Sequence, residues 1–229
     1  MTSTFQKIEP VSKKERVISS LKGAILSGAL EAGEAIVEGK VAQQFGVGQG
    51  LIREALIDLE HQGFVQRTPF SGTQVVKLSA DDAQQIFDIR IALEPLAVSL
   101  AGSMLTAGAF DELERLAATA RRAAKSEDLD TFFESHLAWR RRIWELSANK
   151  YLRQTLEWSV VPLYALYFIR RSNKREGILD TVTDCIQHQD KIMKAYKDRD
   201  FTEAQEVARD FLVRMKDYLG SRLQSSTSD

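Results

Sequence analysis

The side chains best suited to acid–base or nucleophilic chemistry are few in this sequence and lie far apart. They comprise three histidines, His61, His136 and His188, and a single cysteine, Cys185. No histidine has an evident acid–base partner, and the sequence has no glycine-rich phosphate loop, nucleophile elbow or metal-binding helix motif. Cys185 lies in a helical apolar–polar pattern that is typical of a structural residue. We therefore expect a protein that is not an enzyme.

One pair of polar side chains has a spacing that could bind a ligand. His136 and Arg140 are four residues apart in a segment that we expect to be helical, so they should share one face. The planar guanidinium of Arg140 suits a carboxylate or a phosphate. Arg140 also begins a basic run, 140–142, and the alternative interpretation is an exposed charge on a solvated helix face.

Length and composition indicate the class of protein that holds these residues. The chain has 229 residues, of which 44% are hydrophobic and 28% charged, as expected for a globular protein of about two domains. Only four prolines interrupt a sequence rich in helix-forming residues. No apolar run reaches the ~18 residues of a membrane span, and residues 1–10 lack the apolar core of a signal peptide. We expect a cytoplasmic protein.

Residues 1–78 show three helical patterns followed by a β-hairpin. We expect helices at 11–27, 38–45 and 49–62, the first opened by a capping box of Ser12 and Glu15. Segments 64–68 and 73–77 are rich in β-branched and aromatic residues and flank a Pro-Phe-Ser-Gly turn. This order predicts a winged helix-turn-helix domain. The net charge is only +1 here and −2 in the remainder, so net charge alone does not indicate nucleic-acid binding.

The same region resembles the GntR family of bacterial regulators. The resemblance rests on 24–33 (AILSGALEAG), 41–47 (VAQQFGV), 52–56 (IREAL), 63–65 (GFV) and 72–75 (GTQV), in the family's order and spacing. It implies that helix 49–62 inserts its N-terminal end into the major groove of operator DNA, with the hairpin tip along the minor groove. The implied DNA contacts are Lys40, Gly48, Gln49, Gly50, Arg53, Arg67, Ser71 and Gly72.

One stretch departs from the family pattern. Where the family has Ser-Arg-Thr-Pro-Val-Arg, this chain has Gly48-Gln-Gly-Leu-Ile-Arg53. The serine cap, one arginine and the proline are missing, which should weaken DNA affinity and change the operator sequence. Taken without the motif, Arg53 could equally be a solvated helix charge.

Residues 79–229 contain only helical patterns. Short breaks separate six long segments, which predict a mainly α protein with an antiparallel bundle after the winged domain. The expected domains are therefore a DNA-binding domain at 1–78 and an all-helical effector-binding and dimerisation domain at 79–229. The expected helices are 81–103, 110–126, 129–148, 151–171, 177–199 and 201–223.

The helical part resembles the effector domain of the FadR-type subgroup, the FCD domain. The resemblance rests on 88–97 (DIRIALEPLA), on 147–149 (SAN) and on Ile192, Ala195, Asp200 and Ala204. It implies a homodimer on a pseudo-palindromic operator and a repressor released by a metabolite. Arg90, in the first of these segments, could point into the pocket that such domains carry between their helices.

Many members of this subgroup bind a metal in that pocket with one Asp and three His. Aligned on the same landmarks, those positions hold His136, Arg140, Gln189 and Phe211 here, with His188 one residue from a ligand position. A guanidinium repels a cation, so we expect no metal or other cofactor. Instead we expect a small organic acid bound by Arg90, His136, Arg140 and Gln189. The expected apolar walls are Trp139, Trp144, Trp158, Tyr164 and Tyr167.

An alternative for the helical part is a dimerisation module that binds no ligand. It would have the same fold and the same DNA-binding domain, but its interior would be packed shut. A cavity lined by His136, Arg140 and Gln189 would count against this alternative, and the absence of that cavity would count for it.

Overall fold

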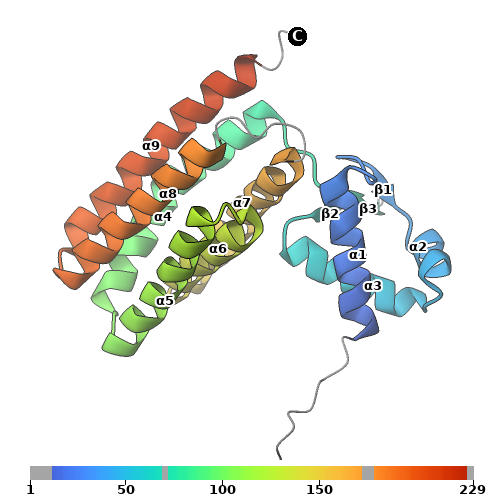
Figure 1. The fold of residues 1–229 in the computed structure, drawn as a ribbon, viewed down its shortest axis with the longest axis horizontal. Helices are drawn as coiled ribbons and strands as arrows, with labels where there is room; N and C mark the ends of the chain where they lie inside the picture. Colours follow the sequence, from blue (N-terminus) through green and yellow to red (C-terminus); the bar gives the residue numbers. More distant parts are fainter. Residues whose placement is uncertain (1–11, 69–71, 172–177, 226–229) are drawn as a thin grey trace, which may run out of the picture. The chain divides into compact units, whose positions relative to one another are not determined.

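A computed structural model describes residues 12–68, 72–171 and 178–225 of the chain (Figure 1). The chain divides into two compact units, residues 1–77 and residues 78–229. We call the first unit the head and the second the body, and each is described by itself.

The head is a winged helix-turn-helix domain, as the sequence predicts. Its sheet has the order β1-β3-β2, and β3 pairs antiparallel with both neighbours, with Val65 opposite Val75 (Figure 1). The two-residue strand β1 was not predicted, because a segment so short shows no alternation of apolar and polar residues. The elements are α1 (Lys13–Ser27), β1 (Ala35–Ile36), α2 (Glu38–Phe45), α3 (Gln49–His61), β2 (Val65–Thr68) and β3 (Gly72–Val75).

Local signals set the helix ends of the head. Ser12 and Glu15 form the expected capping box at the start of α1. Gly46, with φ of 62°, makes the left-handed turn between α2 and α3, a conformation that glycine adopts without steric penalty. Val37 and Gly48 are the N-cap residues that precede α2 and α3, and neither provides a side-chain cap. The backbone N–H groups at both helix starts are therefore not satisfied by a capping side chain.

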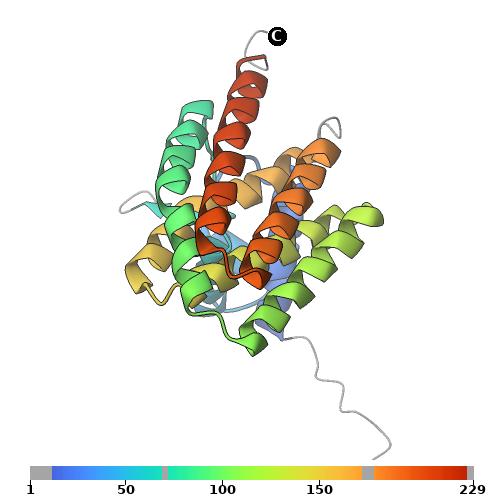
Figure 2. The ribbon, with the colours of Figure 1, turned by 90° about the vertical axis from the view of Figure 1, so that its left-hand side faces the viewer.

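The body consists of α4 to α9 (Figures 1 and 2). Helix α9 packs along α4 and against α8, whereas α5 packs along α6, and α4 also contacts α6 and α7. The bundle of about six helices predicted from the sequence is confirmed. The helices are α4 (Ala80–Ser103), α5 (Ala107–Lys125), α6 (Leu129–Leu146), α7 (Lys150–Arg171), α8 (Ile178–Lys197) and α9 (Phe201–Ser225).

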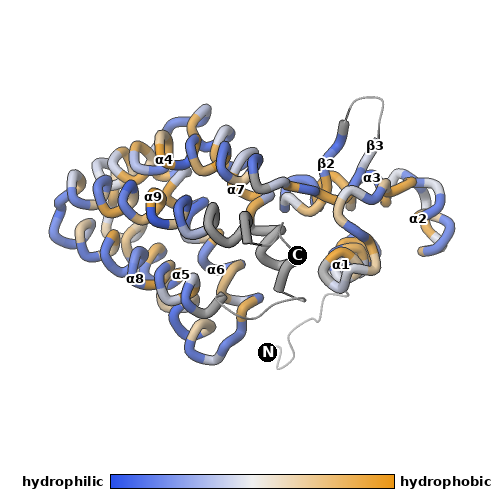
Figure 3. Tube along the Cα trace, turned by 90° about the horizontal axis from the view of Figure 1, so that it is seen from above, coloured by the Kyte–Doolittle hydropathy of each residue, from blue (hydrophilic) through white to orange (hydrophobic). Residues whose placement is uncertain are grey.

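Each helix of the body alternates hydrophobic and hydrophilic residues, as expected for helices with one face in a core (Figure 3). The close packing of α4 on α9 depends on Gly102, because an added methyl group there would lie 2.5 Å from Cδ1 of Phe201. Tyr196 on α8 donates a hydrogen bond of 2.7 Å to the carbonyl oxygen of Val98 on α4. Within the described residues, no helix is both long and apolar enough to cross a membrane.

Candidate DNA interface and effector site

Helix α3 presents one polar face to solvent. Its buried stripe consists of Ile52, Ala55, Leu56 and Leu59. The side chains of Gln49 and Arg53 lie on the opposite, exposed side, close to the N-terminal end of the helix. This arrangement leaves the predicted base-contacting residues accessible to a DNA groove.

Arg53 is held in place by the helix before it. Its Nη2 donates to Oε2 of Glu38 at 2.9 Å and its Nε donates to the same oxygen at 3.2 Å. The hydrogen bond that Arg53 donates to Glu38, together with the negative charge of Glu38, raises the pKa of Arg53. The pair links the start of α2 to α3, so Glu38 orients the guanidinium of Arg53. A DNA phosphate would compete with the Glu38 carboxylate for this guanidinium.

Arg67 on β2 also contacts α3 rather than projecting freely. Its Nη2 donates to the carbonyl oxygen of Arg53 at 3.0 Å, and its Nε lies 3.5 Å from a carboxylate oxygen of Glu60. Arg67 therefore connects β2, the first strand of the β2–β3 hairpin, to α3. If Arg67 also contacts a DNA phosphate, as the sequence predicts, its guanidinium must bind that phosphate as well as the Arg53 carbonyl oxygen and Glu60.

The remaining predicted DNA contacts are mostly exposed backbone or side-chain groups. Lys40, Gly48 and Gly50 are exposed on α2 and at the start of α3. Gly72 is exposed at the start of β3 with φ of 81°, a conformation that favours glycine. Ser71 lies outside the described residues.

The body contains a buried cluster of three charged side chains, which we call the charge cluster: Arg90 and Glu94 on α4, and Arg140 on α6. Each is at most 5% exposed. Nε of Arg90 donates to Oε1 of Glu94 at 2.5 Å, and Nη1 of Arg140 donates to Oε2 of the same carboxylate. One carboxylate thus joins two guanidinium groups from different helices.

The structure buries Arg140, so its interpretation as an exposed charge on a solvated helix face is wrong. The helix turns Arg140 inward, whereas Arg141 and Arg142 are partly exposed and pair with surface carboxylates, Arg141 with Glu157. Sequence reasoning assigns no role to Glu94, although it lies in the segment 88–97. The four-residue spacing from Arg90 to Glu94 was the signal that could have identified the pair.

Two buried histidines lie close to the charge cluster. His136 stacks on Trp139 with ring centroids 6.2 Å apart, and His188 on α8 stacks on Phe211 at 4.0 Å. Burial lowers the pKa of both histidines well below 6.5, and the positive charges of Arg140 and Arg90 lower both further. Both imidazoles are therefore neutral at pH 7.

Several buried polar atoms of α6 and α8 lack a hydrogen-bond partner among the described residues. They are both amide atoms of Gln189, Nδ1 of His188 and Nε1 of Trp139. Gln189 is fully buried on α8. The structure thus brings Arg90, His136 and Arg140 into one buried region and places Gln189, also fully buried, on the helix that carries His188.

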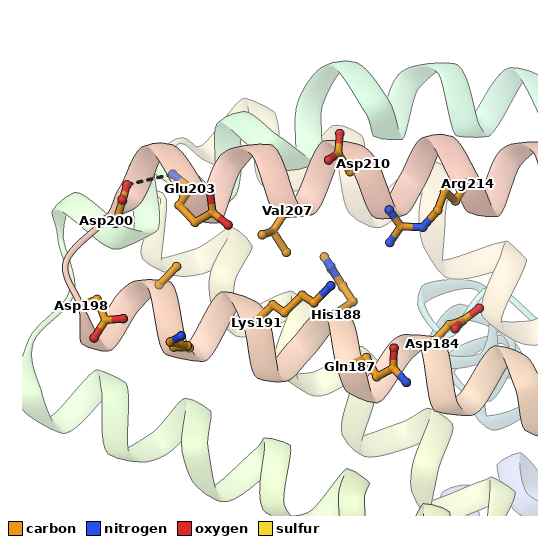
Figure 4. A pocket seen from close by; sticks show the side chains of 12 residues that line it. Asp184, Gln187, His188, Lys191, Asp198, Asp200, Glu203, Val207, Asp210 and Arg214 are labelled. Carbon is orange, nitrogen blue, oxygen red and sulfur yellow. Dashed lines mark hydrogen bonds between the residues drawn. The ribbon is translucent and has the colours of Figure 1, made fainter.

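The cavity beside the charge cluster, which we call the inner cavity, is small. Its volume is about 10 Å³, which is enough for one water molecule. Glu94, Arg140 and His188 line it, whereas His136 and Gln189 do not. A larger groove of about 480 Å³ lies between α8 and α9, and His188 lines this groove as well (Figure 4).

The aromatic walls are only partly as expected. Trp139 and Trp144 are buried and line the inner cavity. Trp158 was expected to line the pocket and does not, because it is 79% exposed. It lies off the buried stripe of α7, which includes Leu152 and Leu156. The side chains of Tyr164 and Tyr167 are outside the described residues.

The residues at the subgroup's metal positions do not suit a metal ion. Arg140 is paired with Glu94, and Phe211, which has no ligand atom, stacks on His188. Among the described residues, no three His, Cys, Asp or Glu side chains gather where they could hold an ion.

Comparison with known proteins identifies the two units. The model of bacterial regulatory proteins of the gntR family matches residues 13–75, and the FCD domain model matches residues 85–214. The chain belongs to the GntR family. Its FCD domain is the architecture of the FadR-type subgroup.

Curated relatives are regulators rather than enzymes. The chain is 29% identical over 154 residues to the HTH-type transcriptional regulator YdhC of Bacillus subtilis, covering 67% of this chain and 69% of YdhC. It is 28% identical over 117 residues to the gluconate operon transcriptional repressor of Bacillus licheniformis, covering 51% of this chain and 48% of that repressor. This GntR protein is thus a DNA-binding transcriptional regulator.

Solved structures share its fold. McbR/YncC of Escherichia coli superposes with a TM-score of 0.68 at 22% identity, covering 93% of this chain and 99% of that one. A GntR regulator from Rhodococcus sp. RHA1 superposes with a TM-score of 0.64 at 16% identity, covering 93% and 98%.

Proposed function

We propose that this GntR protein is a metabolite-responsive repressor whose body binds a small organic acid. The observation that carries the proposal is the charge balance of the buried side chains. Among the described residues these comprise two guanidinium groups, Arg90 and Arg140, and one carboxylate, Glu94, while both buried histidines are neutral. A buried excess positive charge is unfavourable, and an anionic ligand would balance it.

Other buried polar groups of α6 and α8 support the same ligand class. The amide of Gln189 and the Nδ1 atom of His188 lack protein partners in the described structure and could hydrogen-bond to a bound acid. The indole Nε1 of Trp139 is a third such group, and it can only donate. A carboxylate with hydroxyl groups would use both donors and acceptors. One relative is named for gluconate, a hydroxy acid of this kind.

Binding of such an acid requires movement, because the inner cavity accommodates only about one water molecule. We propose that this movement couples the body to the head and changes operator affinity. In the proposed assembly two copies form a homodimer, so that two heads contact the two halves of a pseudo-palindromic operator.

Thermal unfolding tests the ligand. Gluconate, citrate, succinate and benzoate are each added to the wild type and to Arg140→Met. At least one acid should stabilise the wild type, by about 2.7 kcal/mol at a hundredfold excess over its Kd, and the shift should be lost in Arg140→Met. Arg141→Met is the matched control, because it removes a neighbouring arginine that pairs with Glu157 at the surface. Equal stabilisation of the wild type and Arg140→Met would refute the assignment.

A second candidate is a body that only dimerises. The small volume of the inner cavity favours it, as does the absence of His136 and Gln189 from the cavity lining. It predicts that no acid of the panel shifts the unfolding temperature of any of the three proteins, while operator binding and dimerisation are intact.

A further inference from the structure

The groove between α8 and α9 carries an ordered set of charges (Figure 4). Asp198, Asp200 and Glu203 line its end at the turn between the two helices. Lys191 from α8 and Arg214 from α9 line it farther along, beside His188. The turn end of the groove is therefore acidic apart from Lys194, and Lys191 and Arg214 flank the imidazole in a stretch that Asp184 and Asp210 also line.

Both cations are available to a ligand. Among the described residues, neither Lys191 nor Arg214 forms an ion pair. In Figure 4 both side chains extend into the space between the helices, toward His188. Arg214 is close enough to His188 for its charge to contribute to the lowered pKa of the imidazole. The geometry of two unpaired cations around a hydrogen-bonding side chain is complementary to a carboxylate.

His188 is the one described residue that lines both the groove and the inner cavity. His188 is 4% exposed, and its Nδ1 has no hydrogen-bond partner in the described structure. On its inner side lie Arg140 and Glu94, and its ring stacks on Phe211 at 4.0 Å. The imidazole thus separates a cationic surface site from the charge cluster by the thickness of one side chain.

We propose that the α8–α9 groove contains an outer carboxylate-binding site, formed by Lys191 and Arg214, through which an acid reaches the charge cluster when His188 turns aside. Asp198, Asp200 and Glu203 at the turn end repel an anion, so its binding depends on Lys191 and Arg214, which must also offset the charges of Asp184 and Asp210. Nδ1 of His188 provides a hydrogen bond during passage. The identity of the cargo rests on the proposed function, whereas the route can be tested with a simple anion.

Tryptophan fluorescence gives a test that needs no knowledge of the effector. The chain has three tryptophans, and Trp139 and Trp144 line the inner cavity while Trp158 is exposed. In a Trp158→Phe background, the remaining emission reports on the cavity. Quenching is measured with iodide as the anion, caesium as the cation and acrylamide as a neutral probe, at constant ionic strength.

The route predicts that iodide quenches more strongly than caesium. Lys191→Gln combined with Arg214→Gln should lower the iodide quenching constant about threefold and leave acrylamide quenching unchanged. The matched control is Lys197→Gln with Arg209→Gln, which removes the same charges from the same two helices outside the groove lining. His188→Ala should raise quenching by both iodide and acrylamide.

Two results would overturn the route. One is an equal loss of iodide quenching in the groove variant and in the control. The other is that iodide fails to quench the buried tryptophans even in the His188→Ala variant. Failure of every acid to bind, with charge-selective iodide quenching intact, would refute the organic-acid effector but leave the groove as an anion route. If an acid binds the wild type but not Arg140→Met, and binds the groove variant with unchanged rate and affinity, the groove route is refuted and the organic-acid effector stands.

Discussion

Glu94→Gln should destabilise the body much more than Arg140→Met, although the two side chains share a hydrogen bond. Glutamine preserves the shape of Glu94 but removes its charge, so Arg90 and Arg140 remain buried without a carboxylate. Breaking a buried ion pair by removing one partner costs about 3–5 kcal/mol. Arg140→Met instead removes the second cation and leaves Arg90 paired one to one with Glu94, because Nε of Arg90 lies 2.5 Å from Oε1.

The expected cost of Arg140→Met is about 1 kcal/mol, since the methionine keeps most of the apolar stem while one charge-assisted hydrogen bond is lost. The difference between the two variants should therefore be about 3 kcal/mol. For a protein of this size that corresponds to a separation of roughly 6–12 °C in Tm.

Urea unfolding followed by tryptophan fluorescence is the assay, because all three tryptophans belong to the body. Glu157→Gln is the control; it breaks a partly exposed pair with Arg141 and should cost less than about 1 kcal/mol. If Arg140→Met loses as much stability as Glu94→Gln, the two guanidinium groups do not compete for one carboxylate, and the excess-charge reasoning is refuted.

Three further predictions concern the head, the histidines and the packing of α4 on α9. Arg53→Ala should weaken specific operator binding by about 1–3 kcal/mol in a mobility-shift titration while the protein stays folded and keeps its oligomeric state. Burial lowers the pKa of His136 and His188, so stability is present above the unfolded pKa of 6.5 and is lost as pH falls below it. The loss should approach about 1.4 kcal/mol per pH unit for each histidine, and His188→Gln should halve the slope. Gly102→Ala should cost about 1–3 kcal/mol in urea unfolding, because its methyl group would displace Phe201.

Matched substitutions isolate each effect. Arg209→Ala, on the body, should leave operator binding unchanged. His61→Gln, at an exposed position of the head, is the matched histidine-to-glutamine substitution. Gly108→Ala in α5 should be neutral or stabilising, because nothing lies within 4 Å of the added carbon. If a control changes operator binding, the pH slope or stability as much as its test variant does, the physical reason given for that prediction is wrong.

Local features of the sequence predicted most of the secondary structure. The capping box of Ser12 and Glu15 set the start of α1, and glycine marked the end of α1 and the turn after α2. The start of α5 was misplaced. The sequence predicts a helix at 110–126, whereas Thr106 caps a helix that already begins at Ala107. A capping hydroxyl can satisfy the first turn even when glycine follows.

The sequence by itself determined the family, through its motifs. It also determined the order of the helices and of the hairpin strands, and the shared face of His136 and Arg140, because these follow from contacts within a few residues along the chain. Only the tertiary structure decided that Arg140 points inward and that its partner is Glu94, 46 residues away. It also decided that Trp158 points outward and that the inner cavity is almost filled. These properties depend on how α4, α6, α8 and α9 pack together, and packing sets burial, charge balance and free volume.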